Sequence, residues 1–270
     1  MLGYKIFSAS KKISHERPVL VLVHGLGGGH FNWLYQVRHL KNKYDIISIE
    51  LPSHEKSAVK MSELAPSLDS ISEKIIEVLD HLEIEKATFM GLSLGTLIIK
   101  NLVFRYPDRV DKYILIGAIG KISFLFNLSI HLTLCLLPIV PLKILIWIVC
   151  HIFMPFKRLS YGRSLFYQCA QRVERDEFKV WLKAILSYKD MQREYAQTMG
   201  EESNGLYIMG ELDYFFLSLI TKDRKRIKNF AIVQDAGHLC NIDQHKTANQ
   251  LIIDFQDTGT VDAPDRILTY

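Results

Sequence analysis

Short apolar runs alternate with amphipathic segments along this chain, and that alternation restricts the fold more than any other feature of the sequence. The β-branched run Pro18–Val23 has the length of a buried parallel strand, and a cluster of glycines follows it. The next segment, Phe31–Leu40, carries apolar residues at the spacing of a helix with one buried face. Repetition of this pair predicts an α/β fold, a mostly parallel sheet that helices cover on both faces.

The same alternation continues along the rest of the chain. Further strands are predicted at Tyr4–Ser8, Tyr44–Leu51, Ala87–Met90, Val110–Ile116, Gly205–Met209 and Phe230–Val233. Further helices are predicted at Pro66–Leu82, Thr96–Tyr106, Leu217–Lys228 and Lys246–Phe255. The polar tail Asp257–Tyr270 is expected to be loosely held.

The alternation is interrupted in the middle of the chain, between Gly120 and Gly200. We therefore predict a core domain made of residues 1–120 and 201–270, and a helical cap made of residues 121–200. The cap is expected to pack one face on the core and to line a pocket with another.

The first part of this insertion, Ile122–Leu142, contains no charged residue and has the length of a membrane span. A single crossing here would put Ser93 and His238 on opposite sides of a membrane and leave a split sheet with open edges in water. We therefore predict helices that are broken at Pro138 and Pro141 rather than a span.

Contact with lipid is the alternative role for part of the cap. Basic residues follow the apolar run at Lys157, Arg158, Arg163 and Arg172, and a second basic cluster lies at Lys222, Arg224, Lys225, Arg226 and Lys228. Some basic clusters beside apolar segments bind anionic lipid headgroups, whereas most basic clusters are solvated helix faces. Peripheral membrane contact through the cap is therefore a hypothesis.

Charge and cysteine usage exclude several other classes of protein. The chain has 33 basic and 29 acidic residues, a net charge of +4, which is too balanced for a dedicated nucleic-acid binder. The segment Met1–Lys12 lacks the apolar run of a secretion signal. Four cysteines without a C-x-x-C pair indicate buried free thiols in a reducing compartment rather than disulfides or a zinc site: Cys135, Cys150, Cys169 and Cys240. We expect a cytoplasmic protein.

The motif with the clearest chemistry is Gly91-Leu92-Ser93-Leu94-Gly95, a G-x-S-x-G between a predicted strand and a predicted helix. Such a turn is tight, and its glycines let the backbone pass without Cβ collisions. The hydroxyl of Ser93 is then held out at the carboxyl end of the sheet, which makes it the candidate nucleophile.

A serine hydroxyl needs a base, and the base needs an acid that orients it. His238 is the candidate base because it directly follows the strand Phe230–Val233. Asp213, just beyond the strand Gly205–Met209, is the candidate acid; Glu211 is the runner-up, and Asp235 is too close to His238 along the chain. Four other histidines are expected to be structural or exposed: His24, His81, His131 and His245.

Acyl transfer also needs hydrogen-bond donors for the oxyanion of the tetrahedral intermediate. The backbone N–H of Leu94, at the start of the helix after Ser93, is one candidate, and the N–H of Leu26 in the His24–Gly27 turn is the other. The glycines after Val23 lack the spacing of a P-loop or of G-x-G-x-x-G, so nucleotide binding is ranked low.

These motifs resemble those of the α/β-hydrolase superfamily, and of its small capped esterases, lipases and C–C hydrolases in particular. The resemblance rests on Val21–Gly28, Gly91–Gly95, Gly210–Asp213 and Ala236–Asp243. It implies an eight-stranded sheet, a cap inserted after the sixth strand, and a triad of Ser93, Asp213 and His238. Where many members have an aspartate-leucine-proline-glycine-histidine-glycine loop, this chain has Glu50–Glu55, which weakens inference about the substrate.

The predicted function is a serine hydrolase, lipase-like or carboxylesterase-like, that cleaves a carboxylic ester or thioester with an apolar acyl or alcohol group. A serine at the position of Ser93 disfavours haloalkane dehalogenase and epoxide hydrolase chemistry, which use an aspartate there. No metal or organic cofactor is expected. The alternatives are a C–C bond hydrolase or an acyltransferase with the same triad, and a non-catalytic relative that binds lipid or protein.

Overall fold

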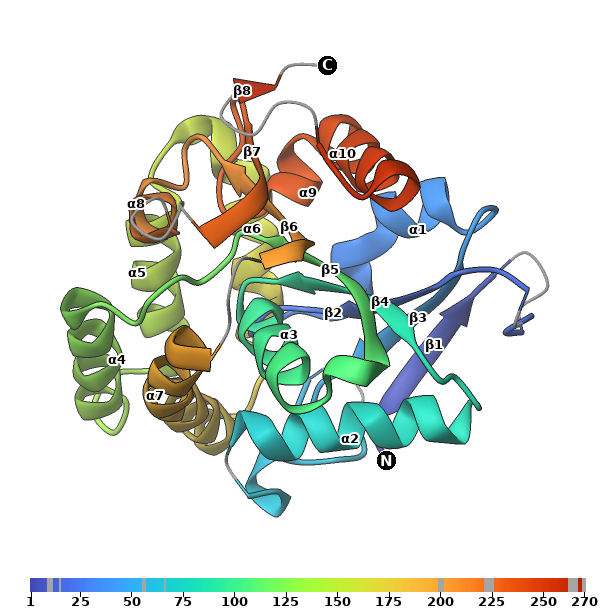
Figure 1. The fold of residues 1–270 in the computed structure, drawn as a ribbon. Coiled ribbons are helices and arrows are strands. Elements are labelled where there is room, and N and C mark those ends of the chain that lie inside the picture. The colour runs from blue at the N-terminus through green and yellow to red at the C-terminus, as the bar shows by residue number, and fades with distance from the viewer. Residues whose placement is uncertain are drawn as a thin grey trace.

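The computed structural model describes residues 1–8, 12–14, 16–54, 57–65, 67–198, 202–220, 226–261 and 267–268, and its centre is one eight-stranded sheet (Figure 1). The strand order is β1-β3-β2-β4-β5-β6-β7-β8. The strands are β1 (Gly3–Phe7), β2 (Val19–Val23), β3 (Asp45–Glu50), β4 (Ala87–Leu92), β5 (Val110–Ile116), β6 (Glu202–Gly210), β7 (Ile227–Val233) and β8 (Ile267–Leu268). Strand β1 is antiparallel to β3, whereas β2 to β7 pair in parallel, so the carboxyl ends of these six strands meet at one edge.

Helices pack on both faces of the sheet, as predicted. They are α1 (Leu34–Leu40), α2 (Leu68–His81), α3 (Leu94–Arg105), α8 (Tyr214–Ile220), α9 (Cys240–Asp243) and α10 (His245–Thr258), with 3₁₀ turns at His30–Trp33, Met61–Glu63, Pro107–Arg109 and Lys157–Leu159. Alternate residues of β2 enter two different hydrophobic clusters, one shared with α2 and α3 and the other with α1 and α10. Burial on both faces explains why this strand is apolar at every position.

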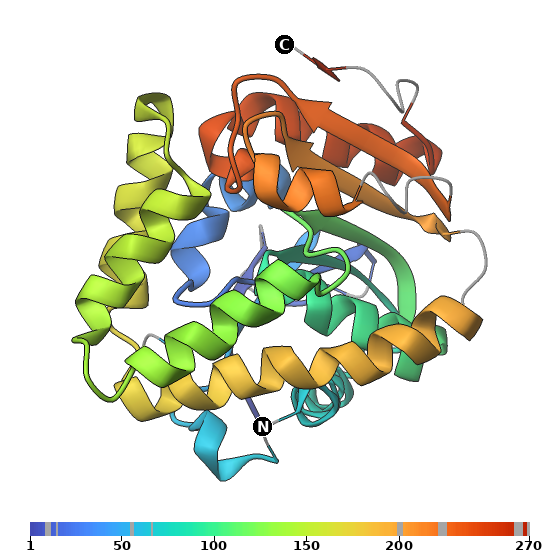
Figure 2. The same ribbon diagram turned by 90° about the vertical axis from the view of Figure 1, so that its left-hand side faces the viewer.

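Four helices connect β5 to β6 in place of a short crossover: α4 (Phe124–Leu136), α5 (Leu142–Phe153), α6 (Ser160–Ala170) and α7 (Arg175–Thr198). We call them the helical insertion. Helix α4 ends before Pro138 and α5 begins after Pro141, so the predicted break at the two prolines is confirmed. Figure 2 shows α7 and α4 running side by side, with α5 turning away from them.

Two features of the insertion bear on the predictions. It follows β5, the fifth strand of the chain, rather than a sixth strand as expected, because only β1 precedes β2. The eighth strand of the sheet is Ile267–Leu268, which pairs with β7 at the edge opposite β1. No helix in the described part of the chain is long and apolar enough to cross a membrane. That residues 121–200 act as a separate cap domain stays a prediction.

Two smaller expectations were wrong, and a third concerns a tail that the structure describes only in part. The helix predicted at Leu217–Lys228 is instead α8 (Tyr214–Ile220), and Ile227 already belongs to β7 because it pairs with β6 there. In the tail Asp257–Tyr270, α10 continues to Thr258 and Ile267–Leu268 pairs with β7, while residues 262–266 and 269–270 lie outside the described residues. Cys135 is exposed on α4, whereas the other three cysteines are buried free thiols. In the second basic cluster, Lys222, Arg224 and Lys225 lie outside the described residues.

Candidate active site

Ser93 occupies a strained turn between β4 and α3. Its φ is 52° and its ψ is −115°, a conformation that residues with a Cβ rarely adopt. A Cβ on Gly95 would lie 2.1 Å from the carbonyl oxygen of Val23, and one on Gly91 would lie 2.7 Å from the backbone of Gly95. The glycines on both sides of Ser93 are therefore required by the close packing of β4, α3 and β2.

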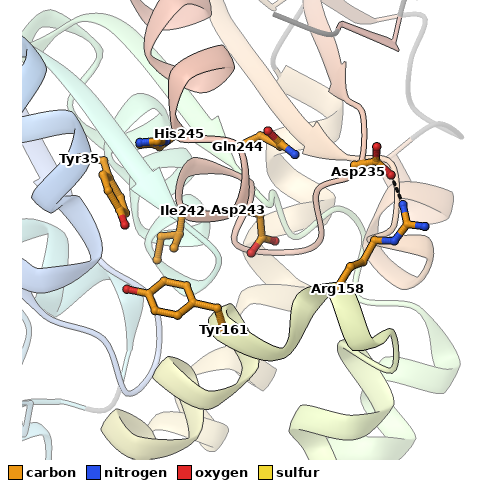
Figure 3. Close-up of a pocket in the computed structure, with 8 residues that line it drawn as sticks. All are labelled: Tyr35, Arg158, Tyr161, Asp235, Ile242, Asp243, Gln244 and His245. Atoms are coloured by element: carbon orange, nitrogen blue, oxygen red, sulfur yellow. Dashed lines mark hydrogen bonds and ion pairs between the residues drawn. The ribbon is translucent and has the colours of Figure 1, made fainter.

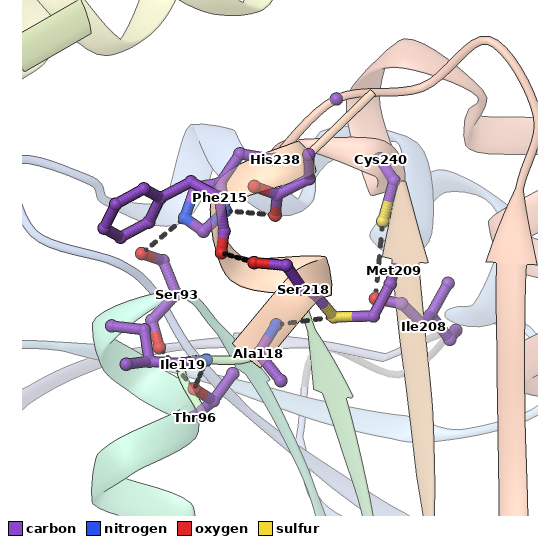
Figure 4. Close-up of polar contacts among 12 residues, drawn as sticks. Ser93, Thr96, Ala118, Ile119, Ile208, Met209, Phe215, Ser218, His238 and Cys240 are labelled. Carbon is purple, nitrogen blue, oxygen red and sulfur yellow. Dashed lines mark hydrogen bonds and ion pairs between the residues drawn. The ribbon is translucent and has the colours of Figure 1, made fainter. Parts of the chain in front are cut away.

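The hydroxyl of Thr96 ties this turn to the neighbouring strand end. It donates to the Ser93 carbonyl at 2.6 Å and accepts from the Ile119 N–H at 3.1 Å (Figure 4). Since the Thr96 side chain is buried, these two bonds hold the conformation of the turn without using the Ser93 hydroxyl.

The structure brings Ser93, His238 and Asp213 together in one hydrogen-bonded chain. The Ser93 hydroxyl lies 2.8 Å from His238 Nε2, and His238 Nδ1 lies 2.7 Å from the Asp213 carboxylate (Figure 4). Asp213 follows β6 and is fully buried, and His238 follows β7 and is nearly so. With the imidazole proton on Nδ1, the Nδ1–H group donates a hydrogen bond to Asp213, and Nε2 is left to accept a hydrogen bond from the Ser93 hydroxyl.

Neighbouring groups fix the position of the His238 ring. The ring of Phe216 stacks on it with centroids 4.7 Å apart and an angle of 29° between the planes. Gly117 has φ of 53°, and a Cβ there would lie 2.3 Å from the His238 carbonyl oxygen. The Gly237 N–H donates to Asp243 at 2.9 Å, and burial raises the pKa of Asp243 to about 6. Phe216 thus packs on the ring, while the contacts of Gly117 and Asp243 hold the backbone of the loop that carries it.

Neither alternative acid reaches His238. The Glu211 carboxylate accepts from the Asp235 N–H at 3.1 Å, and Asp235 forms an ion pair with Arg158. Asp235 also has φ of 55°, so the chain reverses there and its side chain points towards Arg158 (Figure 3). Of the three carboxylates, Asp213 is the one that hydrogen-bonds to His238.

Leu94, one predicted oxyanion donor, follows Ser93 directly, and the turn that carries Leu26, the other, packs on Ser93. Leu94 is the first residue of α3, where backbone N–H groups have no partner in the preceding turn of the helix. In the turn after β2, the N–H groups of Gly27, Gly28 and Gly29 are already donated, to His54, Gly25 and Asn32. A Cβ on Gly25 would lie 3.2 Å from the Ser93 Cβ, so this turn packs directly on the serine. That the Leu26 N–H is its oxyanion donor stays a prediction.

Two buried histidines support this turn, and one of them, His54, was not among the histidines predicted to be structural. His54 Nε2 accepts the Gly27 N–H at 2.8 Å, while its Nδ1 donates to the Pro52 carbonyl at 2.8 Å. His24 Nε2 accepts the Leu51 N–H at 3.1 Å, which fits its expected structural role. Burial lowers the pKa of His54 to about 4 and that of His24 well below 6.5, so both are neutral acceptors. His54 could have been identified from the sequence, because it stands where the aspartate-leucine-proline-glycine-histidine-glycine loop of many family members also has a histidine.

A contact with the helical insertion also shapes the turn. Gly27 has φ of 70°, and a Cβ there would lie 2.4 Å from the Ala170 Cα at the end of α6. The backbone of the turn therefore packs against the backbone of α6.

The departure of the loop after β3 from the resembled pattern has a structural partner on α7. Ser53, where many members have glycine, has φ of 62°, and its hydroxyl donates to Glu177 and accepts the Met61 N–H at 2.8 Å. Ser62 donates to the same carboxylate from its hydroxyl at 2.5 Å and from its N–H at 3.1 Å. Burial would raise the pKa of Glu177, but these hydrogen bonds hold it below its usual range. Glu177 thus anchors α7 to the loop.

A groove of about 540 Å³ lies next to the loop that carries His238. It is lined by Tyr35, Arg158, Tyr161, Asp235, Ile242, Asp243, Gln244 and His245 (Figure 3). None of Ser93, Asp213 and His238 is among these residues, so the groove is not where a substrate would meet Ser93. Within the described ranges, no group of three or more His, Cys, Asp or Glu side chains has the arrangement of a metal site.

Known proteins share this fold and parts of this sequence. A family model described as an alpha/beta hydrolase fold matches residues 18–143. The chain is 39% identical over 101 residues to the dihydrolipoyllysine-residue acetyltransferase component of the acetoin cleaving system of Pseudomonas putida, a match that covers 37% of this chain and 27% of that protein. It is 30% identical over 108 residues to 3-oxoadipate enol-lactonase 2 of Acinetobacter baylyi, with 40% of each chain covered. The chain spans less than half the length of these curated relatives.

The likeness in three dimensions covers almost the whole chain. The enol-lactonase from Burkholderia xenovorans superposes with a TM-score of 0.75 over 95% of this chain and 96% of that chain, at 19% identity. At this level of identity the likeness shows the fold, and it confirms the fold that the sequence motifs implied.

Proposed function

The chain belongs to the α/β-hydrolase superfamily, and from that premise we propose that it is a serine hydrolase of carboxylic esters. The observation that carries the proposal is the hydrogen-bonded chain from the Ser93 hydroxyl through His238 to Asp213. The enol-lactonases among its relatives, which open a cyclic ester by name, support the same reaction class.

In the proposed reaction, Ser93 Oγ attacks the ester carbonyl carbon while its proton passes to His238 Nε2. The carbonyl oxygen becomes an oxyanion, which accepts hydrogen bonds from the N–H groups of Leu26 and Leu94. Asp213 remains ionised and stabilises the imidazolium. When the carbonyl re-forms, the alcohol leaves with the proton from His238 and an acyl-serine remains. Water then attacks the acyl group, its proton goes to His238 and on to Ser93 Oγ, and the acid is released.

An apolar substrate group is supported by the aromatic side chains around His238. Phe216 stacks on the imidazole, and Phe126 and Phe153 of the helical insertion approach Phe216 with ring centroids 5.5 and 5.3 Å apart. An acyl or alkyl chain that packs on aromatic side chains of this kind leaves water, which stabilises the bound substrate. We therefore propose esters with an apolar acyl or alcohol part as the substrate class.

The test compares two serine variants. Ser93→Ala should abolish labelling by a fluorophosphonate probe and lower kcat for p-nitrophenyl esters by about 10⁴-fold or more, because nucleophile and base act as a unit. Ser187→Ala is the matched control, since Ser187 is exposed on α7 and its hydroxyl donates to the Ala184 carbonyl of the same helix. Equal labelling of the two variants would exclude Ser93 as the nucleophile.

Acyl transfer is the second candidate, because the Pseudomonas relative is an acetyltransferase component by name. An acyl-serine can pass its acyl group to an alcohol or a thiol instead of water. Mass spectrometry of the products with added alcohol decides between them: free acid as the main product supports hydrolysis, and a new ester supports transfer.

A further inference from the structure

The outer faces of α4 and α5 carry large apolar side chains that the protein does not cover. Phe124 is 78% exposed, Ile139 in the turn between the helices 81%, and Trp147 52%. Together with their exposed apolar neighbours they form what we call the insertion face: Phe124, Leu125, Leu128, Leu132, Ile139, Ile144, Trp147, Ile148, Ile152 and Phe156. Both helices lie along one edge of the molecule, opposite α1 and α10 (Figure 1).

The side chains of the insertion face are different from those that pack α4 and α5 on the core. Phe126 and Ile130 of α4, and Leu145, Ile146 and Cys150 of α5, are buried in the core cluster. Each helix is therefore apolar on its inner and its outer side. A surface helix normally presents polar side chains to water, so an outer face of this composition indicates a second environment that it contacts.

The charge around the insertion face is of one sign. No aspartate or glutamate occurs between Asp111 and Glu174, whereas Lys143 at the start of α5 and Lys157 just after it are exposed. Arg158 forms an ion pair with Asp235, whereas Arg163 donates to the Met154 carbonyl at the end of α5 and adds to the positive charge of the two lysines. An apolar face with lysines and no carboxylates in its own segment complements a surface that is apolar beneath and anionic at its border.

The dimensions of the helices fit such a surface. Helices α4 and α5 have 13 and 12 residues, which at 1.5 Å per residue is about 20 Å and too short to cross a bilayer of ~30 Å. A short helix with an apolar outer side lies in the interface plane instead, where indole rings such as that of Trp147 are favoured.

We propose that the insertion face of α4 and α5 docks this protein on the surface of an anionic lipid bilayer. The apolar side chains enter the boundary between headgroups and acyl chains, while Lys143 and Lys157 lie at the level of the phosphates. The proposal does not depend on catalysis, and it is tested on a protein that cannot turn over ester.

Tryptophan fluorescence gives a site-specific readout. The chain has three tryptophans, and Trp33 and Trp181 are fully buried, so Trp147 is the one whose surroundings change on docking. We expect Ser93→Ala protein to float with vesicles of phosphatidylcholine and phosphatidylglycerol in equal amounts, and its emission to shift to shorter wavelength. Trp147→Phe should still float but lose the shift. Absence of flotation with these vesicles would overturn the proposal.

Charge-introducing variants test which face docks. Trp147→Glu combined with Leu128→Glu should weaken vesicle binding by about 100-fold, since each would remove one buried apolar side chain from the interface. Leu34→Glu is the matched control, because Leu34 is 56% exposed but lies on α1. Lys143→Ala and Lys157→Ala should each weaken binding by about fivefold, and high salt should do the same. Equal loss of binding in Leu34→Glu would overturn the assignment of the face.

A second copy of the chain is the competing occupant. Light scattering after size-exclusion chromatography shows it as a dimer that Trp147→Glu converts to a monomer. A stable dimer that does not bind the vesicles would assign the insertion face to self-association and overturn the membrane proposal. Circular dichroism spectra that match those of the parent protein establish that each variant is folded.

Discussion

At the scale of single residues, the candidate site depends on glycines, which have no side chain, as much as on its polar side chains. Gly91 and Gly95 let backbone segments approach the Ser93 turn more closely than any Cβ would allow, and a Cβ at Gly25 would make a tight contact of 3.2 Å. The strained φ of Ser93 is held by this packing and by Thr96. Preorganisation of this kind places donors and nucleophile before the substrate arrives, so that little rearrangement is needed during the reaction.

We propose that His54, which accepts the N–H of Gly27, positions the neighbouring Leu26 as oxyanion donor, and this proposal gives a prediction at this scale. His54→Phe removes the acceptor of the Gly27 N–H and leaves that donor unpaired in a buried turn. We expect kcat for p-nitrophenyl esters to fall by about 10-fold to 100-fold with little change in KM, because the oxyanion donor Leu26 acts mainly in the transition state.

Two further variants separate positioning from general damage. His54→Gln keeps a side-chain oxygen that can accept and should recover part of kcat. His81→Gln, at the exposed end of α2, should behave as the parent protein. A rise in KM with unchanged kcat in His54→Phe would contradict the positioning role.

At the scale of elements, the helical insertion is attached to the core by a few buried polar contacts. Glu177 on α7 receives hydrogen bonds from Ser53 and Ser62, and the Trp181 indole N–H donates to the Pro52 carbonyl at 3.1 Å. These contacts join α7 to the loop that also carries His54. The loop, the turn beneath it and α7 therefore form one packed unit.

Removal of the Glu177 carboxylate tests this attachment. Glu177→Ala leaves the donors of Ser53 and Ser62 without their acceptor, so the free energy of unfolding in urea should fall by about 2–3 kcal/mol. Glu174→Ala is the control: Glu174 precedes α7, is largely exposed and pairs with Lys60, so its loss should cost under about 0.5 kcal/mol. Equal costs for the two variants would show that the buried carboxylate does not anchor the helix.

The element scale also separates what the sequence can predict from what it cannot. Ser93, Asp213 and His238 could be found because each follows a predicted strand, and parallel strands bring their carboxyl ends to one edge. The Leu217–Lys228 helix failed because its apolar spacing continues into Ile227, where pairing with β6 determines the conformation. The bond between Ser53 and Glu177 joins residues 124 positions apart, and no local pattern marks it.

At the scale of the whole molecule, the buried histidines make stability depend on pH. Burial lowers the pKa of His30 and His54 to about 4 and that of His24 well below 6.5. The unfolded chain takes up protons on these rings near pH 6.5, whereas the folded protein takes them up on His30 and His54 only near pH 4, and on His24 only well below pH 6.5. The unfolded state therefore binds more protons in this window, and stability is lost as the pH falls through it. Asp243 partly offsets this loss of stability. Its raised pKa means that the folded protein protonates this carboxylate at a higher pH than the unfolded chain does.

We expect the histidines to dominate this balance. His30 and His54 together, less the contribution of Asp243, should lower the free energy of unfolding by on the order of 2 kcal/mol between about pH 7 and pH 5, and His24 acts in the same direction. Urea denaturation at the two pH values measures the difference, and His54→Gln should reduce it. Equal or greater stability at the lower pH would contradict the neutral state of these rings.

The bare backbone at Gly27 has one more consequence. Helix α6 rests on that glycine, and α6 packs in turn against α5, whose outer side carries Trp147. No side chain separates the backbone of α6 from the backbone of the turn at Gly27, so the position of this helix restricts the position of the turn that also carries Leu26.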